Sequence, residues 1–333
     1  MAFEQLVWPK DLIDLDQFSA EHLLAILDSA ETFKEISERE IKKVPTLKGK
    51  LVVLFFHENS TRTRLSFEVA AKRLSADTIA LSASGSSMSK GETLLDTAKN
   101  IMAMNPDALV IRHSASGAPL FLGQRLACPV LNAGDGAHAH PTQALLDLMT
   151  IKQKLGHIDG LKVAIIGDIA HSRVARSNMI GLTTLGASVS VCGPPSMMVT
   201  GLTDEYGVTV HSKPEPALEG ADAVIMLRIQ LERQSGQLFP GAREYASVYG
   251  LNDQRLKLAK PGCLVLHPGP VNQGVELTPE VYECPQSVIL EQVTNGVAVR
   301  MALLYLLVDN VERRSPAQDE PPRPVASEPV IGA

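Results

Sequence analysis

The chain contains 333 residues, of which 45% are hydrophobic and 20% are charged, and its formal net charge is −6. This length predicts about two globular domains, each able to bury its own core. The net negative charge argues against a nucleic-acid-binding protein, which usually presents a basic face. No apolar run approaches the roughly 20 residues that cross a bilayer.

The N-terminus and the cysteines indicate the compartment. Residues 1–16 are mixed and acidic, unlike a secretory signal. The cysteines, Cys128, Cys192, Cys263 and Cys284, are dispersed without a C-x-x-C pair, so the sequence indicates neither a zinc site nor a disulfide framework. We therefore expect a protein of the reducing cytoplasm with no membrane segment.

The first half of the chain alternates helical and strand patterns. The continuous apolar run at 51–56 predicts a strand buried on both faces. Ser19 is expected to cap the first helix, and Leu23, Leu24, Ile26 and Leu27 to form its apolar face. Helices are predicted at 17–42, from 65, at 92–104 and at 141–155, and strands at 51–56, 78–81, 108–111 and 129–132. This alternation predicts a parallel sheet, whose ligands gather at the carboxyl ends of the strands.

A second α/β pattern begins at residue 161, so we place the domain boundary inside the helix that starts at Pro141. Strands are predicted at 161–168, 187–193, 208–211, 223–227 and 263–266, and helices at 172–185 and 297–311. The fold class is therefore α/β, with two domains, each a parallel-sheet sandwich, joined by long helices. The predicted divisions are 1–147, 148–296, a C-terminal helix at 297–312 that packs back on the first domain, and a proline-rich, disordered tail at 313–333.

The turn behind the strand at 51–56 gathers hydroxyl groups and guanidiniums. It holds Ser60, Thr61, Arg62, Thr63 and Arg64 at a helix start, where unpaired N–H groups and the helix dipole favour phosphate. Arginine adds charge in a fork that matches phosphate oxygens. A solvated basic turn behind an N-cap is the alternative, but the complete S-T-R-T-R run directly behind a buried strand favours an anion site.

The second predicted domain opens with a different turn. Gly167 and Asp168 end its first strand, which suggests a dinucleotide site, but the run G-D-I-A-H-S-R lacks the spaced glycines that such a site needs. NAD is therefore disfavoured.

The S-T-R-T-R turn resembles the carbamoyl-phosphate loop of the aspartate and ornithine carbamoyltransferase family, and the resemblance extends over residues 18–310. Without it, His140 would be interpreted as a structural histidine, and Lys90 and Arg173 as solvated charges. The other motifs that carry the resemblance are S-x-x-x-K-G-E at 86–92, H-P-T-Q at 140–143, Arg173 in H-S-R, Arg228 with Gln230, and H-P-G-P at 267–270.

The resemblance implies two substrate sites and no cofactor or metal. Catalytic roles are implied for Arg62, Thr63, Lys90, Arg112 and His140. Binding of carbamoyl phosphate is implied for Ser60, Thr61, Arg62, Thr63, Ser86, Arg112, His140, Gln143, Gly269 and Pro270. Binding of L-aspartate is implied for Lys90, Arg173, Arg228 and Gln230.

Three motifs favour the aspartate branch of the family. Ornithine enzymes generally lack the lysine at the place of Lys90, and they typically carry H-P-C-Q and H-C-L-P where this chain has H-P-T-Q and H-P-G-P. The implied reaction forms N-carbamoyl-L-aspartate and phosphate early in pyrimidine synthesis. The alternatives are a transcarbamoylase for ornithine or an N-acylated amino acid, and a non-catalytic anion-binding or assembly subunit. One departure is Gln273, which stands where many relatives carry an arginine.

The resemblance also implies partners. The serine-rich stretch at 82–90 cannot bury itself, and in the family it reaches the active site of the adjacent subunit. A homotrimer with shared active sites is therefore expected. A higher assembly with a regulatory or dihydroorotase-like chain is a further possibility that the sequence leaves open.

Overall fold

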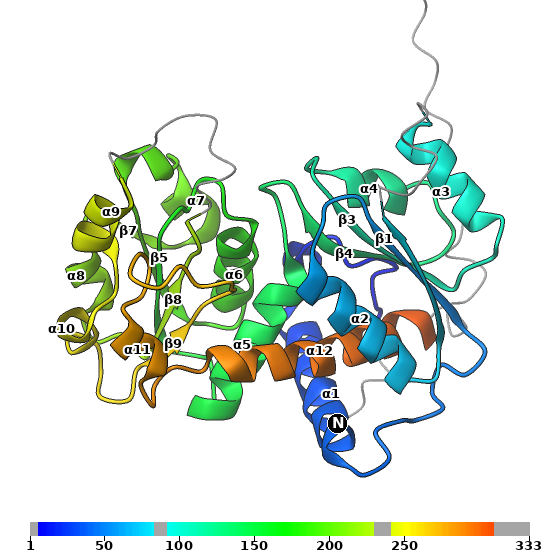
Figure 1. Ribbon diagram of the computed structural model, residues 1–333, viewed down its shortest axis with the longest axis horizontal. Coiled ribbons are helices and arrows are strands. Elements are labelled where there is room, and N and C mark those ends of the chain that lie inside the picture. The colour runs from blue at the N-terminus through cyan, green and yellow to red at the C-terminus, as the bar shows by residue number, and fades with distance from the viewer. Residues whose placement is uncertain (1–5, 83–91, 230–240, 310–333) are drawn as a thin grey trace, which may run out of the picture.

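Two parallel sheets organise the computed structural model, which describes residues 6–82, 92–229 and 241–309 (Figure 1). The first sheet has the order β2-β1-β3-β4 and the second β7-β6-β5-β8-β9, and every pairing between neighbouring strands is parallel. The strands are β1 (Leu51–Phe56), β2 (Asp77–Ser82), β3 (Ala108–His113), β4 (Val130–Asp135), β5 (Lys162–Ile166), β6 (Ser188–Cys192), β7 (Thr209–His211), β8 (Ala223–Met226) and β9 (Leu264–Leu266). The predicted fold class, two α/β domains with parallel sheets, is confirmed.

Helices flank both sheets. Those of the first domain and its connections are α1 (Ala20–Glu38), α2 (Thr61–Arg73), α3 (Leu94–Met102), α4 (Ala118–Gly123) and α5 (Pro141–Leu155). Those that follow are α6 (Arg173–Thr184), α7 (Leu202–Tyr206), α8 (Pro214–Leu218), α9 (Ala242–Tyr249), α10 (Asp253–Leu256), α11 (Pro279–Glu283) and α12 (Ile289–Asp309). None of the described helices combines the length and the apolar character needed to span a membrane.

The first helix follows its prediction at the start but not at the end. The Ser19 hydroxyl accepts a hydrogen bond from the His22 backbone N–H at 3.4 Å and so caps α1. The helix ends at Glu38 because the backbone of Arg39 is extended, four residues before the predicted end at 42. Leu24, which we assigned to the apolar face, is 41% exposed, whereas Leu23 and Ile26 are buried.

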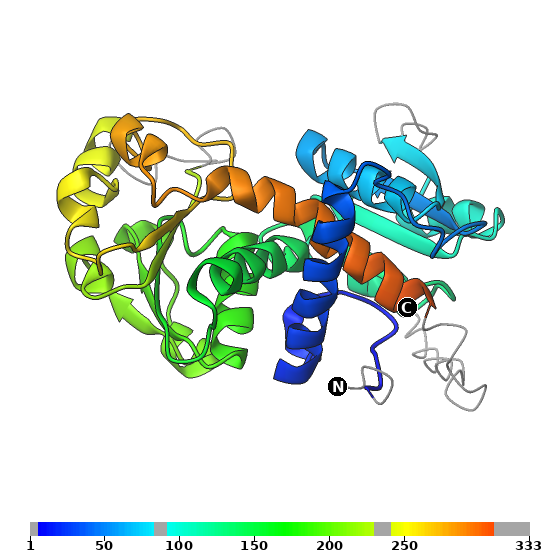
Figure 2. The ribbon, with the colours of Figure 1, turned by 90° about the horizontal axis from the view of Figure 1, so that it is seen from below.

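The last helix is longer than predicted. α12 begins at Ile289 rather than at residue 297, and it packs against α1, α2 and α5 while it also touches β9. The Asn295–Gly296 pair is typical of a turn, yet the buried Asn295 amide donates to the Thr150 hydroxyl of α5 at 2.9 Å. This tertiary contact keeps the segment helical, so α12 runs from the second domain to the first (Figures 1 and 2).

The core continues between the two domains. The largest cluster of buried apolar side chains includes Val52 and Leu54 of β1, Val163 and Ile165 of β5, and the inward faces of α1, α5 and α12. Since α5 and α12 both belong to this cluster, they fix how the carboxyl ends of the two sheets face each other. Three predicted site residues, Ser86, Lys90 and Gln230, and the predicted tail lie outside the described residues.

Candidate active site

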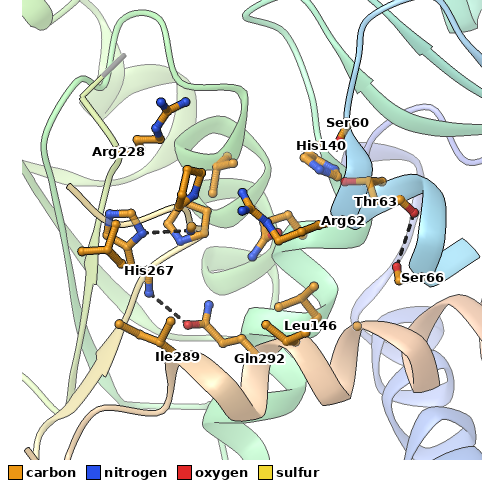
Figure 3. A pocket seen from close by; sticks show the side chains of 18 of the residues that line it. Ser60, Arg62, Thr63, Ser66, His140, Leu146, Arg228, His267, Ile289 and Gln292 are labelled. Atoms are coloured by element: carbon orange, nitrogen blue, oxygen red, sulfur yellow. Dashed lines mark hydrogen bonds between the residues drawn. The ribbon is translucent and has the colours of Figure 1, made fainter. Parts of the chain in front are cut away.

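A cavity of about 490 Å³ lies between the two domains, where the carboxyl ends of β1, β3, β8 and β9 meet the N-terminal ends of α2, α5 and α6 (Figure 3). Its wall on the remaining side is α12. Every predicted site residue in the described part of the chain lines this cavity, namely Ser60, Thr61, Arg62, Thr63, Arg112, His140, Gln143, Arg173, Arg228, Gly269 and Pro270.

The S-T-R-T-R turn forms one wall of the cavity. Ser60 is the N-cap of α2, but its side chain makes no capping hydrogen bond, so the hydroxyl group remains available to a ligand. Arg62 points into the cavity from α2, and Arg228 faces it from the other domain (Figure 3). Burial and the positive charge of Arg228 lower the pKa of Arg62. The Arg62 side chain has no hydrogen-bond partner among the described residues, which suits a side chain that binds a ligand anion.

Glu58 joins the two arginines that were predicted for different substrates. Its Oε1 accepts from Arg112 Nη2 at 2.7 Å and from Arg173 Nη2 at 2.6 Å, and its Oε2 accepts from Arg173 Nη1 at 3.1 Å. Burial alone would raise the pKa of the Glu58 carboxyl, but the hydrogen bonds and charges of Arg173 and Arg112 outweigh burial and lower it to about 2. Arg112 lies at the end of β3 and Arg173 begins α6, so this carboxylate links the two domains.

The backbone next to this ion cluster must lack a side chain. Gly134 has φ +117°, and a Cβ atom there would lie 2.8 Å from Arg112 Nη1 and 3.2 Å from Arg173 Nε. Only glycine accepts both constraints. Glu58 was not among the residues predicted from the sequence, although an acid between a strand end and a basic turn is a usable signal.

His140 is held at the entrance of α5 as a buried, neutral imidazole. Its backbone N–H donates to the Ser177 hydroxyl at 3.0 Å, and that hydroxyl donates to Asp14 Oδ1 at 2.7 Å. Burial and the charges of Arg112, Arg173 and Arg300 lower the pKa of His140 well below its usual value. Its Nδ1 is buried without a hydrogen-bond partner among the described residues. A neutral ring suits a hydrogen bond to a ligand oxygen.

The segment 267–270 closes the cavity on the side of the second domain. The backbone N–H of His267 donates to Gln292 Oε1 at 3.0 Å, and the backbone N–H of Gly269 donates to His267 Nδ1 at 2.8 Å (Figure 3). Burial and the charges of Arg228 and Arg62 lower the pKa of His267 to about 3. Both N–H groups are thus used inside the protein, so the backbone carbonyls are what this segment can offer to a ligand.

Arg228 is positioned through its neighbour Ile229. The Ile229 N–H donates to Glu276 Oε1 at 2.8 Å, and its carbonyl accepts from Asn272 Nδ2 at 3.1 Å. Glu276 is fully buried and also accepts from the Asn272 N–H at 2.7 Å. Neither Asn272 nor Glu276 was predicted from the sequence, although both lie within six residues after H-P-G-P. Gln273, the departure noted in this segment, is exposed.

Arg300 is a buried cation that the sequence analysis also missed. It lies on α12, lines the cavity, and donates to the Gly296 carbonyl at 2.9 Å and the Thr142 hydroxyl at 3.1 Å. Burial, together with the charge of Arg112, lowers its pKa to about 9. No carboxylate among the described residues pairs with it. The signal in the sequence was an arginine inside the apolar run 297–304.

The cavity as a whole is cationic. Five arginines are among its described lining residues, namely Arg62, Arg112, Arg173, Arg228 and Arg300. No described residue that lines the cavity is an aspartate or a glutamate. Guanidiniums from both domains and from α12 therefore converge on one space. Such an arrangement can hold two anions side by side and can stabilise negative charge that develops between them.

Comparison with known proteins gives two consecutive matches. Residues 10–153 match the family described as aspartate/ornithine carbamoyltransferase, carbamoyl-P binding domain, and residues 159–307 match its Asp/Orn binding domain. The catalytic subunit of aspartate carbamoyltransferase from Geobacter sulfurreducens is 61% identical over 296 residues, which cover 89% of this chain and 95% of that protein. The corresponding subunit from Syntrophotalea carbinolica is 58% identical over 309 residues, covering 93% and 98%.

Solved structures of both branches of this family resemble the fold. Ornithine carbamoyltransferase from Thermus thermophilus gives a TM-score of 0.81 at 29% identity, covering 91% of this chain and 100% of that one. Aspartate transcarbamoylase from Trypanosoma cruzi, solved with aspartate and phosphate, gives 0.79 at 30% identity, covering 89% and 95%. The backbone alone therefore does not separate the two branches, whereas the curated relatives quoted above are both aspartate enzymes.

Proposed function

The chain belongs to the aspartate/ornithine carbamoyltransferase family, and from that premise we propose how its cavity works. The protein is a carbamoyl-group transferase that moves the carbamoyl group of carbamoyl phosphate to the amino group of L-aspartate. We assign carbamoyl phosphate to the domain at 1–147 and L-aspartate to the domain at 148–296, and we place the reaction early in pyrimidine synthesis.

The observation that carries this assignment is the pair of anion sites in one cavity. Ser60, Thr61 and Arg62 surround the start of α2, where a phosphate is favoured by the N–H groups and the helix dipole. Arg173 and Arg228 lie on the side of the second domain and supply the two guanidiniums that a dicarboxylate requires. Ser86 for carbamoyl phosphate, Gln230 for L-aspartate, and Lys90 for both the phosphate and the aspartate complete the proposed sites.

The proposed reaction needs no covalent intermediate with the protein. The uncharged amine of aspartate attacks the carbonyl carbon of carbamoyl phosphate, and Thr63, Arg112 and His140 stabilise the oxyanion that forms. The carbon–oxygen bond to phosphate then breaks, and the departing phosphate, held by the α2 turn, takes the proton from the amine. Gln143 and the carbonyls near Gly269 and Pro270 bind the carbamoyl NH₂ group.

Holding two anions together otherwise costs Coulomb energy, so the converging guanidiniums are the main catalytic device of this proposal. The deciding experiment is turnover measured in parallel with carbamoyl phosphate and either L-aspartate or ornithine. We expect turnover with aspartate only. Turnover with ornithine would assign the chain to the other branch. If neither amino acid supports the release of phosphate, a non-catalytic role would remain.

We further propose that the protein works as a homotrimer in the cytoplasm and that Lys90 acts in the active site of an adjacent subunit. Three of the four cysteines are buried and none of the four forms a disulfide, which fits a reducing compartment. Mixing inactive Lys90→Ala chains with inactive Arg62→Ala chains tests the shared site, because hybrid assemblies contain some sites with both residues intact. We expect the mixture to regain activity. If the mixture stays inactive after its subunits have exchanged, each active site is formed by one chain alone. Copurification would show whether a regulatory or dihydroorotase-like chain binds this protein.

A further inference from the structure

A fully buried carboxyl group lies directly behind the cavity without lining it. Asp147 is on α5, one turn after Gln143, and it is 0% exposed. Its Oδ1 accepts from Gln143 Nε2 at 3.0 Å and from Gln292 Nε2 at 2.6 Å, and its Oδ2 accepts from Asn178 Nδ2 at 2.8 Å. Side chains from α5, α6 and α12 therefore meet at one carboxylate.

All three partners of Asp147 present amide nitrogens to it. Burial raises the pKa of Asp147 to about 7, while the hydrogen bonds from Asn178, Gln292 and Gln143 act in the opposite direction. A protonated carboxyl would need an acceptor, but each of these contacts supplies a donor. The arrangement is thus built around the ionised carboxylate.

This carboxylate determines which end of the Gln143 amide faces the cavity. An amide can be turned by half a rotation, but the reversed Gln143 would place its carbonyl oxygen against Asp147 Oδ1, where two acceptors repel. With Nε2 bound to Asp147, the group that Gln143 offers to a ligand is the oxygen Oε1. Gln143 lines the cavity, so this acceptor is available there.

The same carboxylate also orients Gln292. With its Nε2 bound to Asp147, the Gln292 oxygen accepts from the His267 N–H at 3.0 Å and so holds the start of the segment 267–270 (Figure 3). Both proposed binding elements for the carbamoyl NH₂ group, the Gln143 oxygen and the carbonyls of this segment, are therefore fixed from Asp147.

We propose that Asp147 is a positioning residue that makes the cavity select a carbamoyl group over an acyl group without an amino group. This inference rests on the proposed function, because it assumes that Gln143 meets the carbamoyl end of the substrate. A carbamoyl NH₂ donates two hydrogen bonds and needs acceptors, which Asp147 turns toward it. Acetyl phosphate carries a methyl group at that place and donates none.

The test compares carbamoyl phosphate with acetyl phosphate in the assembled enzyme. The readout is the ratio of the inhibition constant of acetyl phosphate to the KM of carbamoyl phosphate, which does not depend on the amount of folded enzyme. Asp147→Asn keeps the size of the side chain but no longer forces one orientation of the Gln143 amide. We expect this ratio to fall by about 10-fold, the worth of one well-oriented hydrogen bond between uncharged groups, through weaker carbamoyl phosphate binding alone. Asp147→Ser is the second variant should the first not fold.

Thr150→Val is the matched control. Thr150 lies one turn further along α5, is fully buried, and accepts from Asn295 of α12 at 2.9 Å, so its loss weakens the same helix contact away from the cavity. This variant should lose stability and keep the ratio. Adding Asp147→Asn to Gln143→Ala should lower the ratio less than Asp147→Asn lowers it in the parent, because the part of the effect that acts through the Gln143 amide is already lost.

Two results would overturn the inference while the parent enzyme still turns over aspartate. One is an equal loss of affinity for both phosphates in Asp147→Asn, which a merely structural role predicts. The other is a ratio that stays unchanged in Asp147→Asn, or one that Asp147→Asn lowers as much in the Gln143→Ala background as in the parent. A parent enzyme without aspartate-dependent turnover would instead refute the proposed function, and this inference with it.

Discussion

Replacing Glu58 by glutamine tests whether this carboxylate holds Arg112 and Arg173 together across the two domains. The side chains of Glu58, Arg112 and Arg173 are 14%, 8% and 7% exposed, so solvent screens the cluster little. The pKa of Glu58 falls from 4.5 to about 2, and a shift of that size corresponds to about 3 kcal/mol. Removing one partner of a buried pair typically costs about 3–5 kcal/mol. Because the amide keeps acceptor capacity, we expect Glu58→Gln to lower the free energy of unfolding by about 2–3 kcal/mol.

The pH dependence gives the sharper test. The folded pKa of Glu58 lies below the unfolded value, so its stabilisation is complete above pH 4.5 and is lost as the pH falls toward 2. The measurement is urea unfolding of both proteins at fixed protein concentration from pH 7 downward. Their difference should be constant to about pH 5 and then shrink. A difference below about 0.5 kcal/mol at pH 7, or one that does not shrink below pH 4.5, would refute the reasoning.

A control for this experiment lies on α2. Glu68 forms an ion pair with Lys72 at 2.6 Å, but the Lys72 side chain is 60% exposed. Such exposed pairs contribute less than about 0.5 kcal/mol. Glu68→Gln should therefore leave the unfolding free energy nearly unchanged, so that any larger effect at Glu58 reports its buried arginine contacts rather than the loss of one negative charge.

Three further variants separate the roles of the cavity residues. Arg228→Ala should lower kcat/KM for aspartate by about 10³-fold or more and leave carbamoyl phosphate binding nearly intact; equal loss of both would place Arg228 on the wrong substrate. His140→Ala should lower kcat by about 10²- to 10³-fold with little change in Tm, whereas a normal kcat with a lowered Tm would indicate a structural histidine. Arg300→Met should weaken phosphate binding by about 10-fold while stability stays within about 1 kcal/mol, and unchanged phosphate affinity in titration calorimetry would contradict this.

The main elements of the fold were predictable because their patterns are local. The apolar run at 51–56 and the start of a helix at Pro141 depend on neighbours in the sequence, and β1 and α5 match them. The start of α12 at Ile289 was not predictable, because the Asn295–Gly296 pair is typical of a turn. The contact of Asn295 with α5 keeps this segment helical. Tertiary contacts of this kind override local preference.

The site divides along the same line. Residues that were expected to touch substrates stand in recognisable short motifs, and the described ones line the cavity. The carboxylates that hold these cavity residues in place were not predicted. Glu58, Asp147 and Glu276 each contact partners from distant parts of the chain. A single aspartate or glutamate is usually a solvated charge in a sequence, and only its burial among donors in the fold identifies it as a positioning group.

The charges around the cavity can be balanced against those of the two substrates. The described lining residues supply five guanidiniums, Glu58 neutralises about one of them, and the lowered pKa values of His140 and His267 keep both rings uncharged. The cluster therefore carries about +4, while a phosphate group brings about −2 and aspartate with an uncharged amine brings two carboxylates. Either substrate alone would leave the cavity strongly cationic. The two anions can bind side by side because their combined negative charge balances the positive charge of the cluster. The same balance explains the position of Glu58, which is the counter-ion that lets Arg112 and Arg173 lie close to each other.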